Sequence, residues 1–427
     1  MRVLHLNTHS SGGSYEYAAL LSTALAEQGI ESQVLCKDST QGENSRPLLD
    51  RVIRRSYVSF STQPWHGTRR LLSPVSAEKL EGVDVVHLHT VADWFDVPSW
   101  LENLPARRGV VISLHDMWHV TGGCFVYSGC DRYGNETKPC ARCPILKWPA
   151  KRFFAVAAYQ RKLRAYQRCG ARLVANSHWL ARIAKQSLIT RACGGLHVIP
   201  PGIDTNIFKP QNKQLCRMQV GLPADAFVIM TGGASLNDTN KNVSWLFEQL
   251  SCLPDLRKVI VVAFGEGTVP VPERLNVRFT GRVPDRYDLA RLFAAADVFV
   301  SASLMETYGL TLVEAMACKT PVIAFRVGGI PEAAPHGRGA ILCQPKDSSA
   351  LLEATTKLRD SPQLRTSLGH DAHQLARDRS AAGSFTRAFV QLYQDCIALK
   401  KTWQTDTATA VAPRRATRIP KGMDEGY

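Results

Sequence analysis

The sequence predicts an α/β protein built from two doubly wound parallel sheets. Short apolar runs alternate with helical patterns along most of the 427 residues, and this alternation is typical of parallel βαβ units. A segment rich in proline and glycine, HVIPPGIDTNIFKP, interrupts it near residue 201 and is typical of a linker. The chain is also long enough for two separate cores. We therefore expect an N-terminal domain over residues 1–200 and a C-terminal domain over residues 201–384.

The expected strands are short runs rich in Val, Ile and Leu, which favour extended structure. In the first domain they are RVLHLN, SQVLC, VDVVHLH, GVVISLHD and ARLVANS, with a helix over roughly 15–28. In the second domain they are FVIMTGG, KVIVVAFG, VRFTGRV, DVFVSAS, PVIAFRV and AILC. We expect residues 385–403 to form a helix that packs back towards the first domain. The tail, residues 404–427, lacks an apolar period and is expected to be disordered.

Charge and hydropathy limit the classes of partner. The net charge of +15 favours an anionic partner such as a nucleotide, a membrane surface or a nucleic acid. No apolar run reaches the length that a membrane-spanning helix needs, and the start MRVLHLNTHSSGGS reads as a strand rather than a signal peptide. We therefore expect a cytoplasmic protein whose cysteines are mostly reduced.

Two glutamates, Glu306 and Glu314, flank an expected strand-to-helix junction in METYGLTLVEAM. Ligands bind beyond the carboxyl ends of the strands in a parallel sheet. Gly309, Leu310 and Thr311 open the helix there, and its free N–H groups can hold a phosphate. Glu314 can then accept hydrogen bonds from ribose hydroxyls, and Glu306 can bind hydroxyls of a sugar. Spacing alone also allows a simpler interpretation, in which both acids only favour the positive end of the helix dipole.

The block SASLMETYGLTLVEAMACKTPVIAFRVGGIPE resembles the nucleotide-sugar site of retaining family-4 glycosyltransferases, which have the GT-B fold. That family has two glutamates separated by seven residues, then an apolar helix, PVIA and a Gly-Gly turn, all of which this block contains. The motifs HD, NS and PPGID extend the similarity more weakly along the chain. LHDMWHVTGGC…CP is similar to a subgroup that builds bacterial exopolysaccharides such as colanic acid. The resemblance implies two Rossmann-like domains that face a central cleft.

The resemblance also implies roles for residues of the second domain. Lys241, in DTNKNVSWL, matches the lysine that neutralises the donor diphosphate. The family usually carries an arginine six positions earlier, where this chain has Ser235, so another cation is needed or neutralisation is weaker. Arg282 and Val283, in TGRVPD, fall near the expected nucleobase pocket.

In the first domain, Gly12–Gly13 lies in a strand-to-helix loop where backbone can approach a ligand closely. The surrounding residues do not form GxGxxG, so a nicotinamide or flavin site is a weak alternative. His115 and Asp116 end the strand GVVISLHD, and the resembling family places a histidine here against the donor sugar. His87 and His89 share one face of VVHLHT and are more typical of a core or of a second layer behind the site.

The implied reaction passes a sugar from a nucleotide-diphosphate donor to a saccharide or lipid-linked acceptor, with retention of anomeric configuration. The catalytic set would be His115, Asp116 and Glu306, with no dedicated nucleophile. The chain contains no Asp-x-Asp, the motif with which metal-dependent glycosyltransferases usually hold their ion. We therefore expect transfer that requires no metal cofactor, with the positive field supplied by Lys241 and helix dipoles.

Four cysteines, Cys124, Cys130, Cys140 and Cys143, lie in an expected insertion over residues 122–146. The final C-x2-C pair has the spacing of a zinc knuckle, and four thiolates suit structural zinc. A reduced loop or a labile disulfide explains them equally well. The adjacent segment 147–172 carries eight Lys or Arg and no acid. It predicts either docking on an anionic membrane, at the inner face of the cytoplasmic membrane, or a buried helix with a solvated basic face.

Two other functions fit parts of the sequence. A nucleotide-sugar epimerase shares the fold, but it needs active-site acids and histidines in a pattern that we do not find. A basic nucleic-acid-binding protein with a zinc knuckle fits the charge. It has no recognised nucleic-acid module here and leaves the paired glutamates unexplained, so we expect no nucleic-acid partner.

Overall fold

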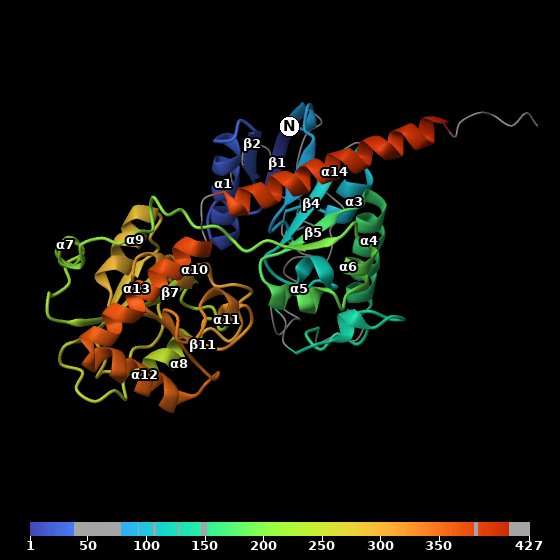
Figure 1. Ribbon diagram of the computed structural model, residues 1–427. Coiled ribbons are helices and arrows are strands. Elements are labelled where there is room, and N and C mark those ends of the chain that lie inside the picture. The colour runs from blue at the N-terminus through green and yellow to red at the C-terminus, as the bar shows by residue number, and fades with distance from the viewer. Residues whose placement is uncertain are drawn as a thin grey trace, which may run out of the picture.

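The computed structural model describes residues 1–37, 78–92, 94–105, 108–126, 129–146, 152–379 and 383–409. Within these residues the chain forms two α/β domains (Figure 1). Each is built around a parallel sheet of six strands. The prediction of two doubly wound parallel-sheet domains is therefore confirmed.

The N-terminal sheet has the strand order β2-β1-β3-β4-β5-β6. Its central strands β3 and β4 are buried along their whole length, as expected for parallel strands covered by helices on both faces. The strands are β1 (Arg2–Asn7), β2 (Glu31–Cys36), β3 (Val85–Leu88), β4 (Gly109–Leu114), β5 (Arg172–Ala175) and β6 (Leu196–Val198). The helices are α1 (Gly13–Ala26), α3 (Val97–Glu102), α4 (Arg152–Cys169), α5 (His178–Ala184) and α6 (Leu188–Ala192).

The C-terminal sheet has the order β12-β11-β10-β7-β8-β9. Its strands are β7 (Phe227–Ser235), β8 (Val259–Glu266), β9 (Val277–Gly281), β10 (Val298–Ser301), β11 (Val322–Phe325) and β12 (Ala340–Cys343). The helices are α7 (Lys213–Gln219), α8 (Val243–Leu250), α9 (Arg286–Ala295), α10 (Leu310–Ala317), α11 (Ile330–Ala333), α12 (Ser348–Asp360) and α13 (Pro362–Arg379). Apolar side chains fill both faces of the sheet and form two separate clusters.

The structure differs from the sequence prediction at β6 and at the start of the first helix. β6 (Leu196–Val198) is a short edge strand that overlaps the start of the segment that the sequence assigns to the linker. Only three residues pair before Pro200 and Pro201, and proline cannot donate to a ladder. The strand therefore has no alternating pattern long enough to detect. The first helix begins at Gly13, two residues before the expected start.

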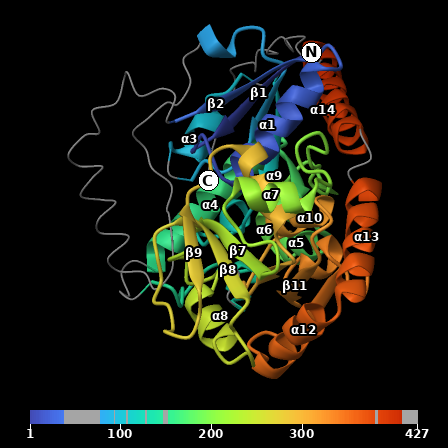
Figure 2. The same cartoon turned by 90° about the vertical axis from the view of Figure 1, so that its left-hand side faces the viewer.

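The last helix, α14 (Ser384–Thr409), returns to the N-terminal domain. Figure 2 shows α12 and α13 along one side of the C-terminal domain and α14 beside the N-terminal domain. Phe389 and Tyr393 of α14 are fully buried in a cluster with Tyr17 of α1 and with residues of β3 and β4. The helical backbone continues through residues 404–409, which the sequence predicts to be disordered. Extending an existing helix needs no new nucleus. Residues 410–427 of the predicted tail lie outside the described residues.

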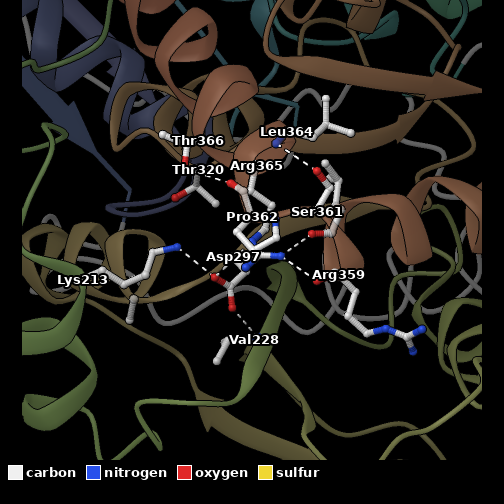
Figure 3. Close-up of polar contacts among 12 residues, drawn as sticks. Lys213, Val228, Asp297, Thr320, Arg359, Ser361, Pro362, Leu364, Arg365 and Thr366 are labelled. Atoms are coloured by element: carbon white, nitrogen blue, oxygen red, sulfur yellow. Dashed lines mark hydrogen bonds and ion pairs between the residues drawn. The ribbon is translucent and has the colours of Figure 1, made fainter.

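A buried ion cluster holds the amino end of the C-terminal sheet (Figure 3). Asp297, just before β10, accepts hydrogen bonds from the Arg217 guanidinium at 2.6 Å and the Val228 N–H at 2.8 Å. The Lys213 ammonium donates to its other oxygen at 3.0 Å, and Arg365 lies 3.7 Å away. Burial alone would raise the pKa of Asp297, but Lys213, the Val228 N–H and Arg217 together lower it. The carboxylate is therefore charged and joins β7, β10 and α7.

Candidate active site

A cavity of about 690 Å³ lies between the two domains, where the β1–α1 loop faces the C-terminal sheet. Gly12 and Gly13 line it from the N-terminal domain, and Arg282 and Val283 line it from the C-terminal domain together with the start of α10. A cavity of about 770 Å³ lies beside Asp297, at the amino ends of the strands. We place the candidate site in the cavity between the domains, because parallel sheets bind ligands beyond the carboxyl ends of their strands.

The amino end of α10 is open towards this cavity. Gly309 caps the helix with φ of +93°, in the left-handed region where glycine is favoured, and no side chain caps the helix among the described residues. Leu310 and Thr311 line the cavity. Their N–H groups belong to the first turn of a helix and have no partner within it. The end of α10 can therefore bind an anion.

Glu314 lines the same cavity and has one unpartnered carboxylate oxygen. Glu314 is 3% exposed, and its Oε1 accepts a hydrogen bond from Arg286 at 2.7 Å. Its Oε2 is buried and has no hydrogen-bond partner among the described residues. Burial raises the pKa of Glu314, and Arg286 only partly opposes this shift. Because a buried unpaired oxygen is costly, a ligand hydroxyl at this position would be stabilising.

Arg286 is a site residue that the sequence analysis missed. It lines the cavity at the start of α9 and contacts Glu314 of its own domain and, at 3.5 Å, Glu16 of α1. It therefore joins the two domains across the site. A sequence signal was available, because Arg286 lies four residues after Arg282, a residue predicted to lie at the site. Ser235 also lines the cavity, so Arg282 and Arg286 bring positive charge to a wall where the family usually has an arginine in place of Ser235.

Lys241 and Glu306 form an ion pair beside this cavity rather than on its walls. Lys241 passes close to Gly233, where an added Cβ would meet its side chain at 3.3 Å, and Gly233 does line the cavity. Burial alone would lower the pKa of Lys241, but Glu306 and Asp238 raise it above its ordinary value. The lysine is therefore charged at neutral pH, and its nearest anion is Glu306.

The loop that carries Glu306 is docked on the N-terminal domain. Thr307 Oγ1 donates to the carbonyl of His115 at 3.1 Å and accepts from Asn176 at 3.0 Å. Ser177 Oγ donates to the Thr307 carbonyl at 2.7 Å. These contacts bring the carboxyl ends of β4 and β5 against the loop of the paired glutamates. The motifs HD and NS, distant from Glu306 in sequence, thus meet it in space.

The Gly-Gly turn explains how this loop packs so closely. An added Cβ at Gly328 would lie 1.9 Å from the carbonyl oxygen of Glu306, and one at Gly329 would lie 2.1 Å from that of Thr307. No side chain fits at either position without a shift of backbone. Nearby, the carboxylate of Glu332 accepts the N–H groups of His178 and Trp179, at 2.7 and 2.6 Å, across the domain boundary.

Asp116, predicted as catalytic, is engaged in its own turn. Its Oδ1 accepts the N–H of Trp118 at 2.7 Å. Burial raises its pKa to about 6, against the opposing effects of that N–H and of Lys162. Neither Asp116 nor His115 lines the cavity between the domains. His115 meets the site through its backbone contact with Thr307, whereas the hydrogen bond of Asp116 with Trp118 stabilises the loop that follows β4.

The four cysteines gather around one small cavity of about 20 Å³, and none is in a disulfide. The Gly122 N–H donates to Cys140 Sγ at 3.2 Å, and burial raises the pKa of the Cys140 thiol to about 12. Cys124 and Cys143 are in hydrogen-bond contact, but within the described residues no three of the four sulfurs lie within 4.8 Å of one another. Structural zinc stays a prediction, which metal analysis of the purified protein decides.

The basic helix α4 packs into the core of its domain. Tyr159, Lys162 and Tyr166 are fully buried, so the inward face predicted by the simpler interpretation is present. Phe153 and Phe154, at the start of the helix, are 78% and 50% exposed. Residues 147–151 of the basic segment lie outside the described residues. In the part of the chain that the structure describes, no helix has the length and apolar character of a membrane span.

Comparison with known proteins identifies the class. Residues 11–207 match the family described as Glycosyltransferase Family 4, and residues 226–361 match Glycosyl transferases group 1. D-inositol 3-phosphate glycosyltransferase 2 of Catenulispora acidiphila is 28% identical, covering 86% of each chain. The D-inositol 3-phosphate glycosyltransferase of Acidothermus cellulolyticus is 31% identical, covering 52% of each chain.

Solved structures show the same fold. Sucrose-phosphate synthase from Thermosynechococcus elongatus superposes with a TM-score of 0.63 at 18% identity, covering 93% of this chain and 99% of that one. HepE from Anabaena, in complex with UDP and glucose, superposes with a TM-score of 0.59 at 18% identity, covering 92% and 99%.

The fold and the two matched domains define a glycosyltransferase of the GT-B type. More narrowly, the chain carries a family 4 domain followed by a group 1 domain. The predicted glycosyltransferase class is thus confirmed. The colanic-acid subgroup, retention of configuration and metal independence stay predictions.

Proposed function

We propose that this enzyme transfers a sugar from a nucleotide-diphosphate sugar, bound in the cavity between the domains, to a hydroxyl acceptor. The observation that carries the proposal is that Glu314, which has a buried, unpartnered Oε2, lines one cavity together with the open end of α10 and Gly12–Gly13. A carboxylate that accepts hydrogen bonds from hydroxyls, next to helix N–H groups that bind an anion, suits a ribose diphosphate. HepE, of the same fold, was solved with UDP-glucose, which supports a donor of this class.

In this proposal the donor extends along the cavity from Arg282 towards Lys241 beside it. The nucleobase lies against Arg282 and the backbone of Val283, and the ribose hydroxyls donate to Glu314. The diphosphate lies at the N–H groups of Leu310 and Thr311. Lys241 then exchanges part of its contact with Glu306 for a phosphate oxygen, and Glu306 is free to accept hydroxyls of the sugar.

The reaction replaces one bond to the anomeric carbon by another. The bond from that carbon to the departing phosphate oxygen breaks, and a bond to the acceptor oxygen forms on the same face. The acceptor proton passes to the departing phosphate oxygen. Charge builds up on the diphosphate as it leaves, and the α10 N–H groups and Lys241 stabilise that charge without a metal.

We further propose that the acceptor is a lipid-linked saccharide, as in exopolysaccharide synthesis, and that the enzyme docks on an anionic membrane. The exposed Phe153 and Phe154 at the start of the basic helix α4 support this, because exposed aromatic side chains beside cations suit a lipid surface. Flotation with anionic liposomes should recover the protein at low salt. A protein that stays at the bottom of the gradient at every salt concentration contradicts docking.

A thermal-shift screen tests the donor proposal. UDP, GDP, ADP and their sugars are added separately, and one base should raise the Tm, because a ligand at about 100 times its Kd stabilises the folded state by about 2.7 kcal/mol. Glu314→Gln is expected to reduce this shift, whereas Glu353→Gln, at an exposed pair on α12, should leave it unchanged. If no nucleotide raises the Tm at millimolar concentration, the proposed donor site is wrong.

A further inference from the structure

Three histidines form a hydrogen-bonded chain that ends at His115, whose backbone contacts the Glu306 loop beside the candidate site. His5 lies on β1 and His89 follows β3, and their rings meet with His5 Nδ1 3.0 Å from His89 Nε2. The other nitrogen of His89, Nδ1, lies 3.1 Å from Nε2 of His115. Because β1, β3 and β4 are neighbours in the sheet, the strand order itself places these residues in line. We call His5, His89 and His115 the histidine chain.

The histidine chain is enclosed and uncharged. His5 and His89 are fully buried. Burial lowers the pKa of His5 to about 3 and that of His115 to about 4, and it lowers the pKa of His89 well below its ordinary value. Each ring is therefore neutral at pH 7 and carries one proton, on one of its two nitrogens.

Other side chains of the N-terminal domain and of α14 pack around the histidine chain. The His87 ring lies 4.2 Å from that of His89, centroid to centroid, but its nitrogens contact Ser113 at 2.8 Å and Tyr393 of α14 at 2.7 Å. Tyr17 packs edge-on against His115, and His119 contacts the His89 carbonyl at 3.0 Å. His87 is therefore a neighbour of the chain and not a link in it.

A chain of three neutral imidazoles has two self-consistent proton arrangements. In the first, His5 donates to His89 and His89 donates to His115, so His115 carries its proton on Nδ1. In the second, both hydrogen bonds reverse and His5 must carry an N–H at Nε2. That atom is buried without a hydrogen-bond partner among the described residues. Orphaned buried N–H groups are rarer than under-used acceptors, which favours the first arrangement.

We propose that His5 and His89 are positioning residues that hold the proton of His115 on Nδ1. Because Nε2 of His115 is occupied by His89, Nδ1 is the ring nitrogen left for a ligand. It presents an N–H, which donates to a hydroxyl oxygen of the donor sugar. This inference rests on the proposed function, since it assigns the donor sugar as the partner of His115.

Nitrogen NMR of the whole protein tests the proton positions without any assay of activity. With ¹⁵N-labelled histidine at pH 7, His115 is assigned by the signals lost in His115→Gln. Its Nδ1 should show the shift of a protonated nitrogen and its Nε2 that of an unprotonated one. A His115 protonated on Nε2, or on both nitrogens, overturns the proposal. This readout holds even if the donor proves not to be a nucleotide sugar.

The variant His5→Phe removes the far end of the histidine chain without touching His115. We expect two tautomers of His115 in place of one, and sugar transfer lower by about 10- to 100-fold, by analogy with the loss of a hydrogen-bond partner behind a metal-bound histidine. The affinity for the free nucleoside diphosphate should not change, since His115 faces the sugar. His197→Gln is the matched control, because His197 lies on β6 and contacts Arg172.

The possible outcomes distinguish the positioning role of His5 and His89 from the proposed donor-binding function. Loss of transfer in His5→Phe with normal nucleotide affinity and mixed tautomers supports the positioning role. Normal transfer in His5→Phe, or a single unchanged tautomer of His115, overturns it. Absence of nucleotide binding in the wild type contradicts the proposed function instead, and leaves the tautomer of His115 measured.

Discussion

Lys241→Ala is expected to lower kcat/KM for sugar transfer by about 10²–10³-fold, which corresponds to about 2.7–4 kcal/mol of lost transition-state stabilisation. The charge that develops on the leaving diphosphate needs a fixed cation, and Lys241 is held charged beside the site by Glu306. Glu306→Gln should have an effect of similar size, because it removes both the partner of that lysine and the proposed contact with the sugar hydroxyls.

Steady-state kinetics with the donor found in the screen provides the measurement, and Lys258→Ala is the matched control. Lys258 pairs with Asp225 at the surface of the same domain, where both side chains are largely exposed, so its loss should leave kcat/KM unchanged. All variants should keep the Tm of the wild type within a few degrees. Near-normal turnover of Lys241→Ala would remove this lysine from the mechanism.

Asp297→Asn is expected to lower the free energy of unfolding by about 3–5 kcal/mol, because breaking a buried ion pair leaves an uncompensated charge. The main contribution comes from Arg217, which is 4% exposed. Lys213 is 41% exposed, so solvent screens its ion pair with Asp297 and breaking that pair costs less stability. Denaturant titration measures the change. An unaltered midpoint relative to the control Asp255→Asn, whose carboxylate pairs with Arg257 at the exposed surface, would show that the cluster does not hold the sheet.

The same cluster predicts a pH dependence. Lys213, Val228 and Arg217 lower the pKa of Asp297 in the folded state against the effect of burial. A carboxyl group with a depressed folded pKa contributes stability that is fully present above its unfolded pKa, near 3.9. That stability is lost as the pH falls through the folded pKa. The difference in stability between wild type and Asp297→Asn should therefore shrink below about pH 4.

The sequence was sufficient for the architecture because the central strands, such as β3, β4, β10 and β11, are continuous apolar runs that are buried along their whole length. It was insufficient for β6, whose three residues carry no period. The end of α14 was also not predicted, because helix extension does not depend on an apolar stripe. Both cases concern short segments in which backbone hydrogen bonding, rather than side-chain burial, decides the structure.

For the site, the paired glutamates and the glycines could be predicted because strand-to-helix junctions fix their place at the sheet edge. The contact of Arg286 with Glu16 and the contacts of Thr307 could not be predicted, since these partners lie in the other domain and no local pattern encodes a contact between domains. The histidine chain could be predicted only in part. The burial of His87 and His89 follows from their strand, but the link from His5 through His89 to His115 requires the strand order.

The most direct test of the central claim is a crystal structure of the enzyme with its nucleotide-diphosphate sugar. We predict the ribose hydroxyls within hydrogen-bond distance of Glu314 Oε2, the diphosphate at the Leu310 and Thr311 N–H groups, and the sugar between Glu306 and His115. A donor bound in the cavity beside Asp297, or a donor whose ribose lies away from Glu314, would contradict this account.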